Sequence, residues 1–99
     1  MEERRAHFRQ PSTQLTVSAD GAFFSTIEWS QGNMVIDAAE RYRVGALVSI
    51  DALGFDKHSL QRVDIRGRVT RVTDIGAAAV DFLHRDDAAM LTLRALAGD

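Results

Sequence analysis

Cysteine is absent from this 99-residue chain. Without a thiol the protein can form no disulfide, no thiolate metal site and no cysteine nucleophile. Lysine and proline each occur once, and the formal net charge is -2. This charge argues against a protein that holds long nucleic acid through its phosphates, because that mode of binding depends on a clear basic excess.

Aromatic residues and long apolar runs are also scarce. A small barrel that binds single-stranded nucleic acid would expose aromatic side chains beside a basic groove, whereas aromatic residues make up 7% of this chain. No uncharged apolar run approaches the ~20 residues that a membrane-spanning helix requires, and the N-terminus is charged from its second residue. We therefore expect a cytoplasmic protein that does not insert into membranes and binds no nucleic acid polymer.

The residues that are present divide the chain into two parts. Residues 1–14 are rich in arginine and contain Pro11, so they are expected to form a flexible segment that leads into the first strand. Residues 15–99 have the length and apolar content of a single compact domain with one core. Eleven of the twelve cations are arginines, a bias that is typical of a GC-rich genome.

Alternation of apolar and polar residues predicts six strands in the domain. Asp20 and Gly21 are expected to form the first turn. Gly32 and Asn33 are expected to form the second, because both residue types readily adopt positive φ. Gly67 is expected to mark a bend or bulge in the long fifth strand. The expected strands are residues 15–18, 22–29, 34–38, 46–53, 60–73 and 77–83.

The C-terminal residues 85–96 predict a helix. They are rich in helix formers, carry Asp86 and Asp87 in the first turn, and end before Gly98. Four apolar side chains are expected on its buried face: Ala89, Met90, Leu93 and Leu96. Short strands with hairpin-length connections and one terminal helix indicate a mainly β fold, a small six-stranded antiparallel barrel that closes because closure removes exposed strand edges.

Candidate catalytic groups are few. Ser30 and Gly32 match the second half of a nucleophile elbow, but its first glycine is missing and the chain is too short for the α/β sheet that such a turn needs. The histidines are spread along the sequence without metal-ligand spacing, and Asp86 and Asp87 are better explained as charges at a helix N-terminus. We therefore expect no catalytic residue, no metal, no cofactor and no enzymatic activity. The histidines are His7, His58 and His84.

Arginines also gather near the N-terminus, as Arg4, Arg5 and Arg9. The planar guanidinium group suits a phosphate or the edge of a guanine. Arg5 and Arg9 match the R-x-x-x-R motif that marks the N-terminal segment of the PilZ domain family, and the sequence resembles this family. Arg4 corresponds to the additional arginine that often precedes the motif.

A second PilZ motif, D/N-x-S-x-x-G, lies at a turn between two early strands of that family. Here Glu28 and Ser30 fall on its first and third positions, and Asn33 falls where the family has glycine. Glu28 is one methylene longer than the family's Asp or Asn, and Gly32 could shift the turn by one residue. The resemblance covers nearly the whole chain, including the strand segments 44–50, 67–72 and 79–83 and the terminal helix.

The resemblance implies a barrel plus helix that acts as a receptor for the bacterial second messenger cyclic di-GMP. Such a receptor would relay the signal to a protein partner in motility, biofilm formation or surface behaviour. The implied binding residues are Arg4, Arg5, Arg9, Glu28, Ser30, Gly32 and Asn33. An alternative is a PilZ-like adaptor that has lost the nucleotide and works through protein contacts alone.

The resemblance also implies a role for each residue. Arg5 and Arg9 are expected at a guanine edge and at the phosphates, and Arg4 at a phosphate or stacked on a base. Ser30 is expected to form a hydrogen bond with a phosphate or a guanine, and Glu28 to accept hydrogen bonds from guanine N1 and N2. Trp29 is expected to pack against the barrel.

Overall fold

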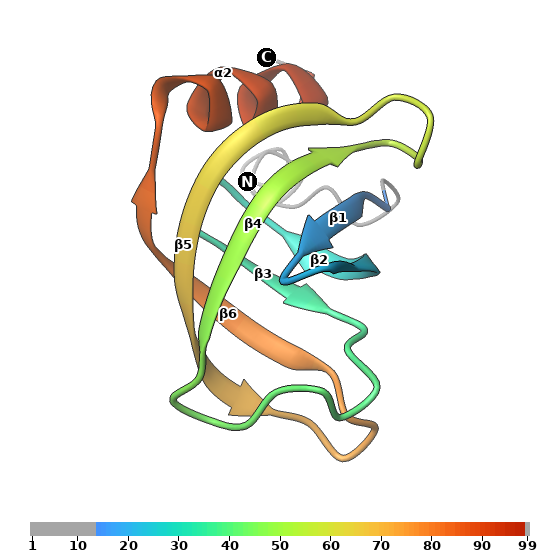
Figure 1. The fold of residues 1–99 in the computed structure, drawn as a ribbon, viewed down its shortest axis with the longest axis vertical. Coiled ribbons are helices and arrows are strands. Elements are labelled where there is room, and N and C mark those ends of the chain that lie inside the picture. Colours follow the sequence, from blue (N-terminus) through green and yellow to red (C-terminus); the bar gives the residue numbers. More distant parts are fainter. Residues whose placement is uncertain (1–13, 99) are drawn as a thin grey trace, which may run out of the picture.

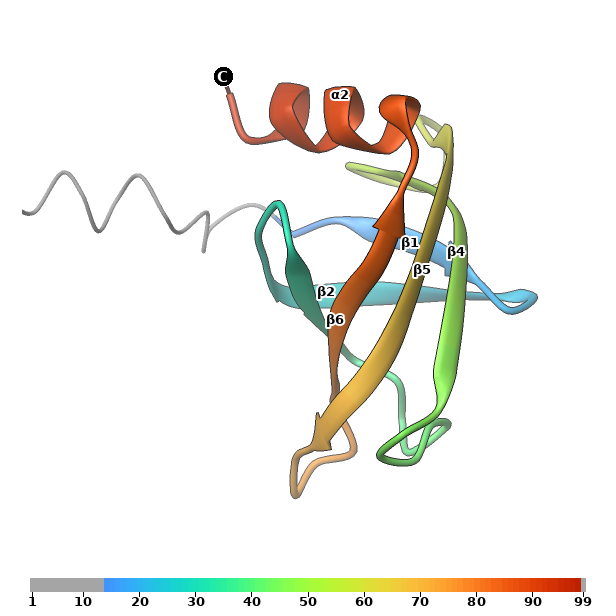
Figure 2. The same cartoon turned by 90° about the vertical axis from the view of Figure 1, so that its left-hand side faces the viewer.

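The computed structural model describes residues 14–98, so the segment with Arg4, Arg5 and Arg9 lies outside the described residues. Six strands form a closed antiparallel barrel, and a helix lies across one end of it (Figures 1 and 2). The predicted fold class is therefore confirmed. The elements are β1 (Thr16–Ala19), β2 (Ala22–Trp29), β3 (Asn33–Ile36), β4 (Leu47–Gly54), β5 (Gln61–Val72), β6 (Ala78–Arg85) and α2 (Asp87–Leu96).

The strands follow one another around the barrel in the order β1, β2, β3, β6, β5, β4. The sheet closes because β1 pairs with β2 on one side and with β4 on the other. The 12-residue β5 pairs with both β4 and β6 and curves along one side of the barrel (Figure 1). The third strand ends at Ile36, two residues earlier than the sequence pattern predicts.

Gly67 lies at an irregularity of the β5–β6 pairing, as predicted for a bend in the long strand. The register shifts between Arg66 and Gly67. A Cβ atom at Gly67 would lie 2.5 Å from a methyl carbon of Val80 and 2.9 Å from the carbonyl oxygen of Asp81. Only glycine lets β6 approach β5 this closely, so this residue allows the two strands to curve together.

The first hairpin turn consists of Asp20 and Gly21, as predicted. Their φ angles are 50° and 82°, and Ala19 pairs with Ala22 across the turn. Two successive residues with positive φ form the type I′ turn that matches the twist of a two-residue hairpin. The Asp-Gly pair supplies residue types that adopt this conformation at low cost.

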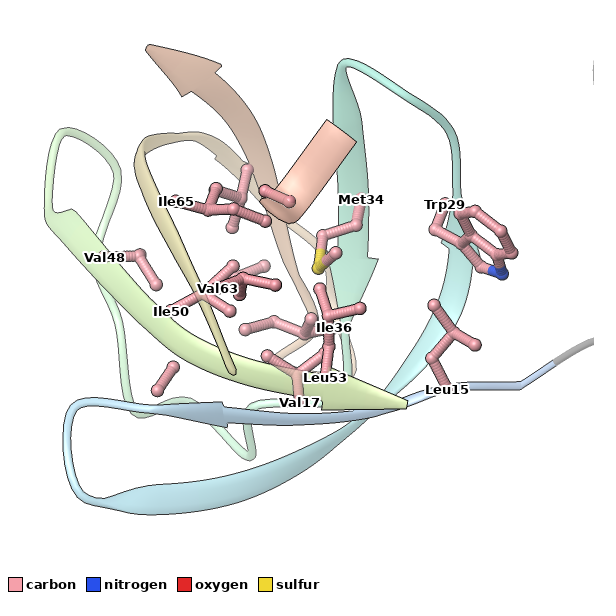
Figure 3. Packing of buried hydrophobic residues seen from close by; sticks show 14 of the residues in the cluster. Leu15, Val17, Trp29, Met34, Ile36, Val48, Ile50, Leu53, Val63 and Ile65 are labelled. Atoms are coloured by element: carbon pink, nitrogen blue, oxygen red, sulfur yellow. The ribbon is translucent and has the colours of Figure 1, made fainter. Parts of the chain in front are cut away.

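Apolar side chains from every strand and from α2 fill the barrel. Trp29 is 4% exposed and belongs to this cluster, as expected; Figure 3 shows it near the end of the cluster where Leu15 also lies. A fully buried Leu or Ile side chain contributes about 1.5–3 kcal/mol to folding. The largest fully buried side chains are Leu15, Met34, Ile36, Ile50, Leu53, Ile65, Leu93, Val17, Val48, Val69, Val80 and Thr26.

The helix α2 begins at an N-cap formed by Asp86. One carboxylate oxygen of Asp86 accepts hydrogen bonds from the backbone N–H of Ala89 (2.8 Å) and of Asp64 in β5 (3.2 Å). Ala89 and Leu93 are buried against the barrel end, but Met90 is 37% exposed. Met90 was predicted on the buried face of the helix, and this prediction is wrong. Met90 lies about 100° around the helix axis from the buried Ala89, so its side chain points away from the barrel end.

No helix within residues 14–98 combines the length and the apolar character needed to cross a membrane.

Asp20 also joins the first turn to the connection between β3 and β4. The Tyr42 hydroxyl donates to its carboxylate at 2.7 Å, and the Arg41 guanidinium donates to its backbone oxygen at 3.0 Å. Arg41 lies over the Phe24 ring, 5.9 Å from its centroid, and the rings of Phe24 and Tyr42 are 5.8 Å apart. Burial, followed by the hydrogen bond and the negative charge of Asp20, raises the pKa of Tyr42 above its ordinary value of 10.0.

The raised pKa of Tyr42 predicts a loss of stability at high pH. In the unfolded chain this tyrosine ionises near its ordinary value, so its contribution to folding is complete below about pH 10 and falls as the pH rises above it. Between about pH 10 and pH 12, the free energy of unfolding should fall more steeply for the wild type than for Tyr42→Phe. Urea unfolding measures the difference. Since the chain has one tyrosine, tyrosinate absorbance gives its pKa directly, and equal slopes for the two proteins would contradict the prediction.

Two non-glycine residues after β3 also have positive φ. Ala39 has φ 48° and Glu40 has φ 67°, and the backbone N–H of Arg41 donates to the carbonyl of Ala38 at 2.8 Å, which closes the turn. A left-handed conformation costs an L-residue roughly 1–2 kcal/mol because Cβ crowds the following carbonyl. This turn is therefore strained at two successive positions.

Ala39→Gly should relieve part of this strain. We expect the free energy of unfolding to rise by about 1 kcal/mol, since glycine adopts positive φ without the Cβ contact. Ala88→Gly, in the exposed part of α2, is the matched control and should lower stability by about 0.5–1 kcal/mol. Chemical denaturation measures both, and a loss of stability in Ala39→Gly would contradict the strain.

Candidate functional site

A β-bulge in β2 shapes the outer face of the barrel. The pairing of β2 with β3 shifts between Thr26 and Glu28, so Ile27 and Glu28 are both exposed while Thr26 and Trp29 are buried. Without the bulge, strict alternation would send one of these two neighbours inward. The bulge therefore places Glu28 on the outer face together with an apolar neighbour.

Glu28 begins a row of side chains that crosses four strands. It pairs with Val35 of β3, Val35 pairs with Ala79 of β6, and Ala79 pairs with Arg71 of β5. Directly opposed residues of an antiparallel sheet point to the same face. Val35 and Ala79 are half-buried, and Glu28 and Arg71 are exposed. The row forms a low apolar floor with a carboxylate on one side and a guanidinium on the other.

A second outer row lies beside the first. Asn33 of β3 pairs with Asp81 of β6, which pairs with Arg68 of β5. All three residues are exposed. This row brings an amide and a second carboxylate to the same face as Glu28.

The surface is hollowed over these rows. One hollow of about 280 Å³ is lined by Glu28, Asn33, Met34, Val35, Thr70, Arg71, Ala79, Val80 and Asp81. The adjoining hollow of about 530 Å³ is lined by Ile27, Glu28, Val35, Arg71, Val72, Thr73, Asp74, Ile75 and Ala77. They share Glu28, Val35 and Arg71, and we refer to the two hollows together as the groove. Its total volume falls in the range of small-molecule sites.

Carboxylates outnumber cations in the groove. Glu28, Asp74 and Asp81 line it, and among the lining residues within 14–98 Arg71 is the only cation. Within residues 14–98, the ion pairs join Asp64 to Arg66 and to His84, and none involves a groove residue. The groove therefore offers acceptors for hydrogen bonds and, without further cations, repels an anion.

The turn between β2 and β3 closes through the side chain of Ser30. The Ser30 hydroxyl accepts from the backbone N–H groups of Gly32 and Asn33, both at 3.2 Å, and donates to Oδ1 of Asn33 at 3.1 Å. Neither Gly32 nor Asn33 has positive φ, so the predicted left-handed residue at this turn is wrong. A serine hydroxyl that accepts hydrogen bonds from successive backbone N–H groups can reverse the chain without a residue of positive φ.

Strand β6 holds this turn in place. The carbonyl of Gly32 accepts from the backbone N–H of Phe82 at 3.0 Å, and the half-buried Arg85 donates to the carbonyl of Gln31. The turn is thus tied to the strand that supplies Ala79 and Asp81 to the groove.

The described chain begins beside the groove. Leu15 donates its backbone N–H to the Thr26 hydroxyl at 2.9 Å, and Thr26 donates its N–H to the Leu15 carbonyl, also at 2.9 Å. Thr26 is buried and precedes Glu28 by two positions in β2. At a strand rise of about 3.3 Å per residue, the arginine-containing segment joins the barrel about 7 Å along β2 from Glu28.

The structure brings together part of the site that the sequence predicts. Glu28 and Asn33 line one hollow, whereas Ser30 and Gly32 form the turn at its edge. Arg4, Arg5 and Arg9 lie outside the described residues. Sequence reasoning missed the four remaining groove residues named in the two rows, because only strand register shows that they share a face with Glu28; they are Val35, Arg71, Ala79 and Asp81.

No group of three or more His, Cys, Asp or Glu side chains in residues 14–98 is placed to hold a metal ion. Comparison of the chain with models of known protein families and with curated proteins finds no match. Arg66, Arg68 and Arg71 are exposed on β5. Arg71 is distinguished from the other two because it also lines the groove.

The role of Ser30 in the turn predicts a loss of stability on its removal. Ser30→Ala leaves two backbone N–H groups without their acceptor, so the free energy of unfolding should fall by about 1–2 kcal/mol. Ser25→Ala, at an exposed position of β2, the strand that leads into this turn, should change it by less than about 0.5 kcal/mol. Urea unfolding of the two variants makes the comparison, and equal effects would contradict the assigned role.

Proposed function

We propose that this protein is a cyclic di-GMP receptor of the PilZ type. The observation that carries the proposal is the outer-face row that places Glu28, Val35, Ala79 and Arg71 side by side, with Asn33 in the adjacent row. Two positions of the second PilZ motif thereby lie in one hollow. The arginines of the first motif join the barrel close to it, through Leu15.

The ligand's chemistry divides between the two segments. Guanine presents N1 and N2 donors on one edge, which the Glu28 carboxylate can accept, and O6 and N7 acceptors on another, which a guanidinium fork matches. The two phosphates need cations that the groove lacks apart from Arg71. Arg5 and Arg9 would supply them, with Arg4 at a phosphate or stacked on a base.

The arginine segment has the reach for this role. Arg9 and Leu15 are six positions apart in the sequence, with five residues between them, so the connecting chain spans at most about 20 Å. Leu15 is held beside Thr26 by two backbone-linked hydrogen bonds. Binding would hold the arginines of the segment on the ligand and alter the surface presented to a protein effector in motility, biofilm formation or surface behaviour.

Calorimetric titration of cyclic di-GMP into the full chain tests the proposal. We expect binding at ligand concentrations up to about 50 µM, and a loss of affinity of about 100-fold in Arg5→Ala with Arg9→Ala, since each removes a charge-assisted hydrogen bond. Arg71→Ala should weaken binding by about tenfold. Arg94→Ala, at an exposed position of α2, is the matched control and should leave the affinity unchanged. A wild type that shows no binding in this range overturns the proposal.

A second candidate is an adaptor that binds proteins and no nucleotide. The hydroxyl of Ser30 favours it, because this group is already committed to Gly32 and Asn33 within the turn. The double variant Glu28→Asp with Asn33→Gly restores the second motif and distinguishes the two candidate functions. Binding created in this variant and absent from the wild type supports the adaptor.

A further inference from the structure

The groove combines an apolar floor with carboxylates on its rim. Val35 and Ala79 form the floor on one side, and Ile27 and Ile75 line the adjoining hollow. Glu28 and Asp81 are exposed and form no ion pair with a side chain in residues 14–98. A complementary occupant carries an apolar side chain between cations and approaches as an extended chain.

An occupant of this composition belongs to the chain itself. The sequence of residues 4–9 is Arg-Arg-Ala-His-Phe-Arg, with one apolar ring among three guanidinium groups. The sequence continues through residues 10–14 to Leu15, which is fixed to Thr26 of β2. Because the tether is short, the effective concentration of this segment at the groove is about millimolar.

We propose that residues 4–9 occupy the groove of the same molecule when no nucleotide is present. Arginines of the segment pair with the carboxylates of Glu28 and Asp81, and Phe8 covers the floor formed by Val35 and Ala79. Arg71 stands on the far side of this floor and repels the arginines, so it confines the cations to the Glu28 side.

This self-contact depends only on the composition of the groove and of the segment, and it goes beyond nucleotide binding. An arginine that forms a bidentate pair with Glu28 or Asp81 has that edge of its guanidinium group occupied, and only the remaining N–H donors are left for a phosphate. An anionic ligand that needs the same edge therefore has to displace the carboxylate first. The segment acts as a tethered competitor that sets a threshold for such a ligand.

A spin label on the segment tests the proposal in the absence of nucleotide. The chain has no cysteine, so Ala6→Cys carries a nitroxide at one position. Amide signals of Val35 and Ala79 should lose intensity by about twofold or more relative to the reduced label, since the tether keeps the segment at the groove. Signals of Ser49 and Ala52, on β4 at the opposite side of the barrel, should keep theirs.

Charge removal distinguishes binding from simple proximity. Glu28→Gln with Asp81→Asn should restore most of the lost intensity, as should about 1 M NaCl, which shortens the screening length to about 3 Å. Asp51→Asn removes an exposed carboxylate from β4 and should have no effect. The amide spectrum of each variant shows whether the barrel remains folded.

Three outcomes overturn the proposal. In the first, intensity is lost equally at Val35 and Ser49, or at neither. In the second, the amide signal of Val35 loses as much intensity in Glu28→Gln with Asp81→Asn, and at high salt, as it does in the labelled parent protein at low salt. In the third, a mixture of labelled protein and unlabelled isotope-enriched protein shows the same loss, which would identify the occupant as a second copy. No nucleotide enters the experiment, so its failure is distinct from a failure of cyclic di-GMP binding.

Discussion

Closure of the barrel is the constraint on which the other features depend. The sheet becomes a ring only because β1 pairs on both edges and because β5 curves far enough to pair with β4 and β6 at once. Gly67 permits that curvature, since a Cβ there would overlap with β6. The same curvature carries Arg71, at the far part of β5, onto the outer face shared with Glu28. A site assembled from four strands therefore depends on a glycine that contributes no atom to its lining.

The fold could be predicted from the sequence to a large extent, because most of its determinants are local. Period-two alternation identifies the strands, and Asp20 and Gly21 identify their hairpin. Asp86 and Asp87 indicate where α2 starts, although Arg85, predicted as its first residue, ends β6 and Asp86 is the N-cap. Met90 was misplaced because a helical pattern shows which residues are apolar but does not show how far the partner surface extends around the helix. The prediction for the turn between β2 and β3 is wrong because glycine and asparagine indicate a residue with positive φ. In this turn the hydrogen bonds of the Ser30 hydroxyl reverse the chain instead.

The candidate site was predictable only in part, because it combines local motifs with register. Glu28 and Asn33 could be found from their spacing, but Arg71 and Asp81 could not, since they reach the site through the pairing of β6 with β3 and β5. The bulge in β2 also shifts the register of its pairing with β3, and the alternation of apolar and polar residues in the sequence does not show this shift. The resulting groove is rich in acceptors and poor in cations. In the proposed receptor, recognition of bases and neutralisation of phosphates would therefore fall to different parts of the sequence.

The closed ring has a consequence for how any partner can bind. Open sheets are often recognised by strand addition, in which a peptide pairs with the free N–H and C=O groups of an edge. In residues 14–98 every strand has a neighbour on both sides, so the barrel offers no such template. Backbone pairing is largely insensitive to sequence, whereas contacts between side chains depend on it strongly. Any partner that binds the barrel is therefore recognised through side chains, in the groove or elsewhere on the outer surface, and substitutions there can alter recognition without changing the strand pairing.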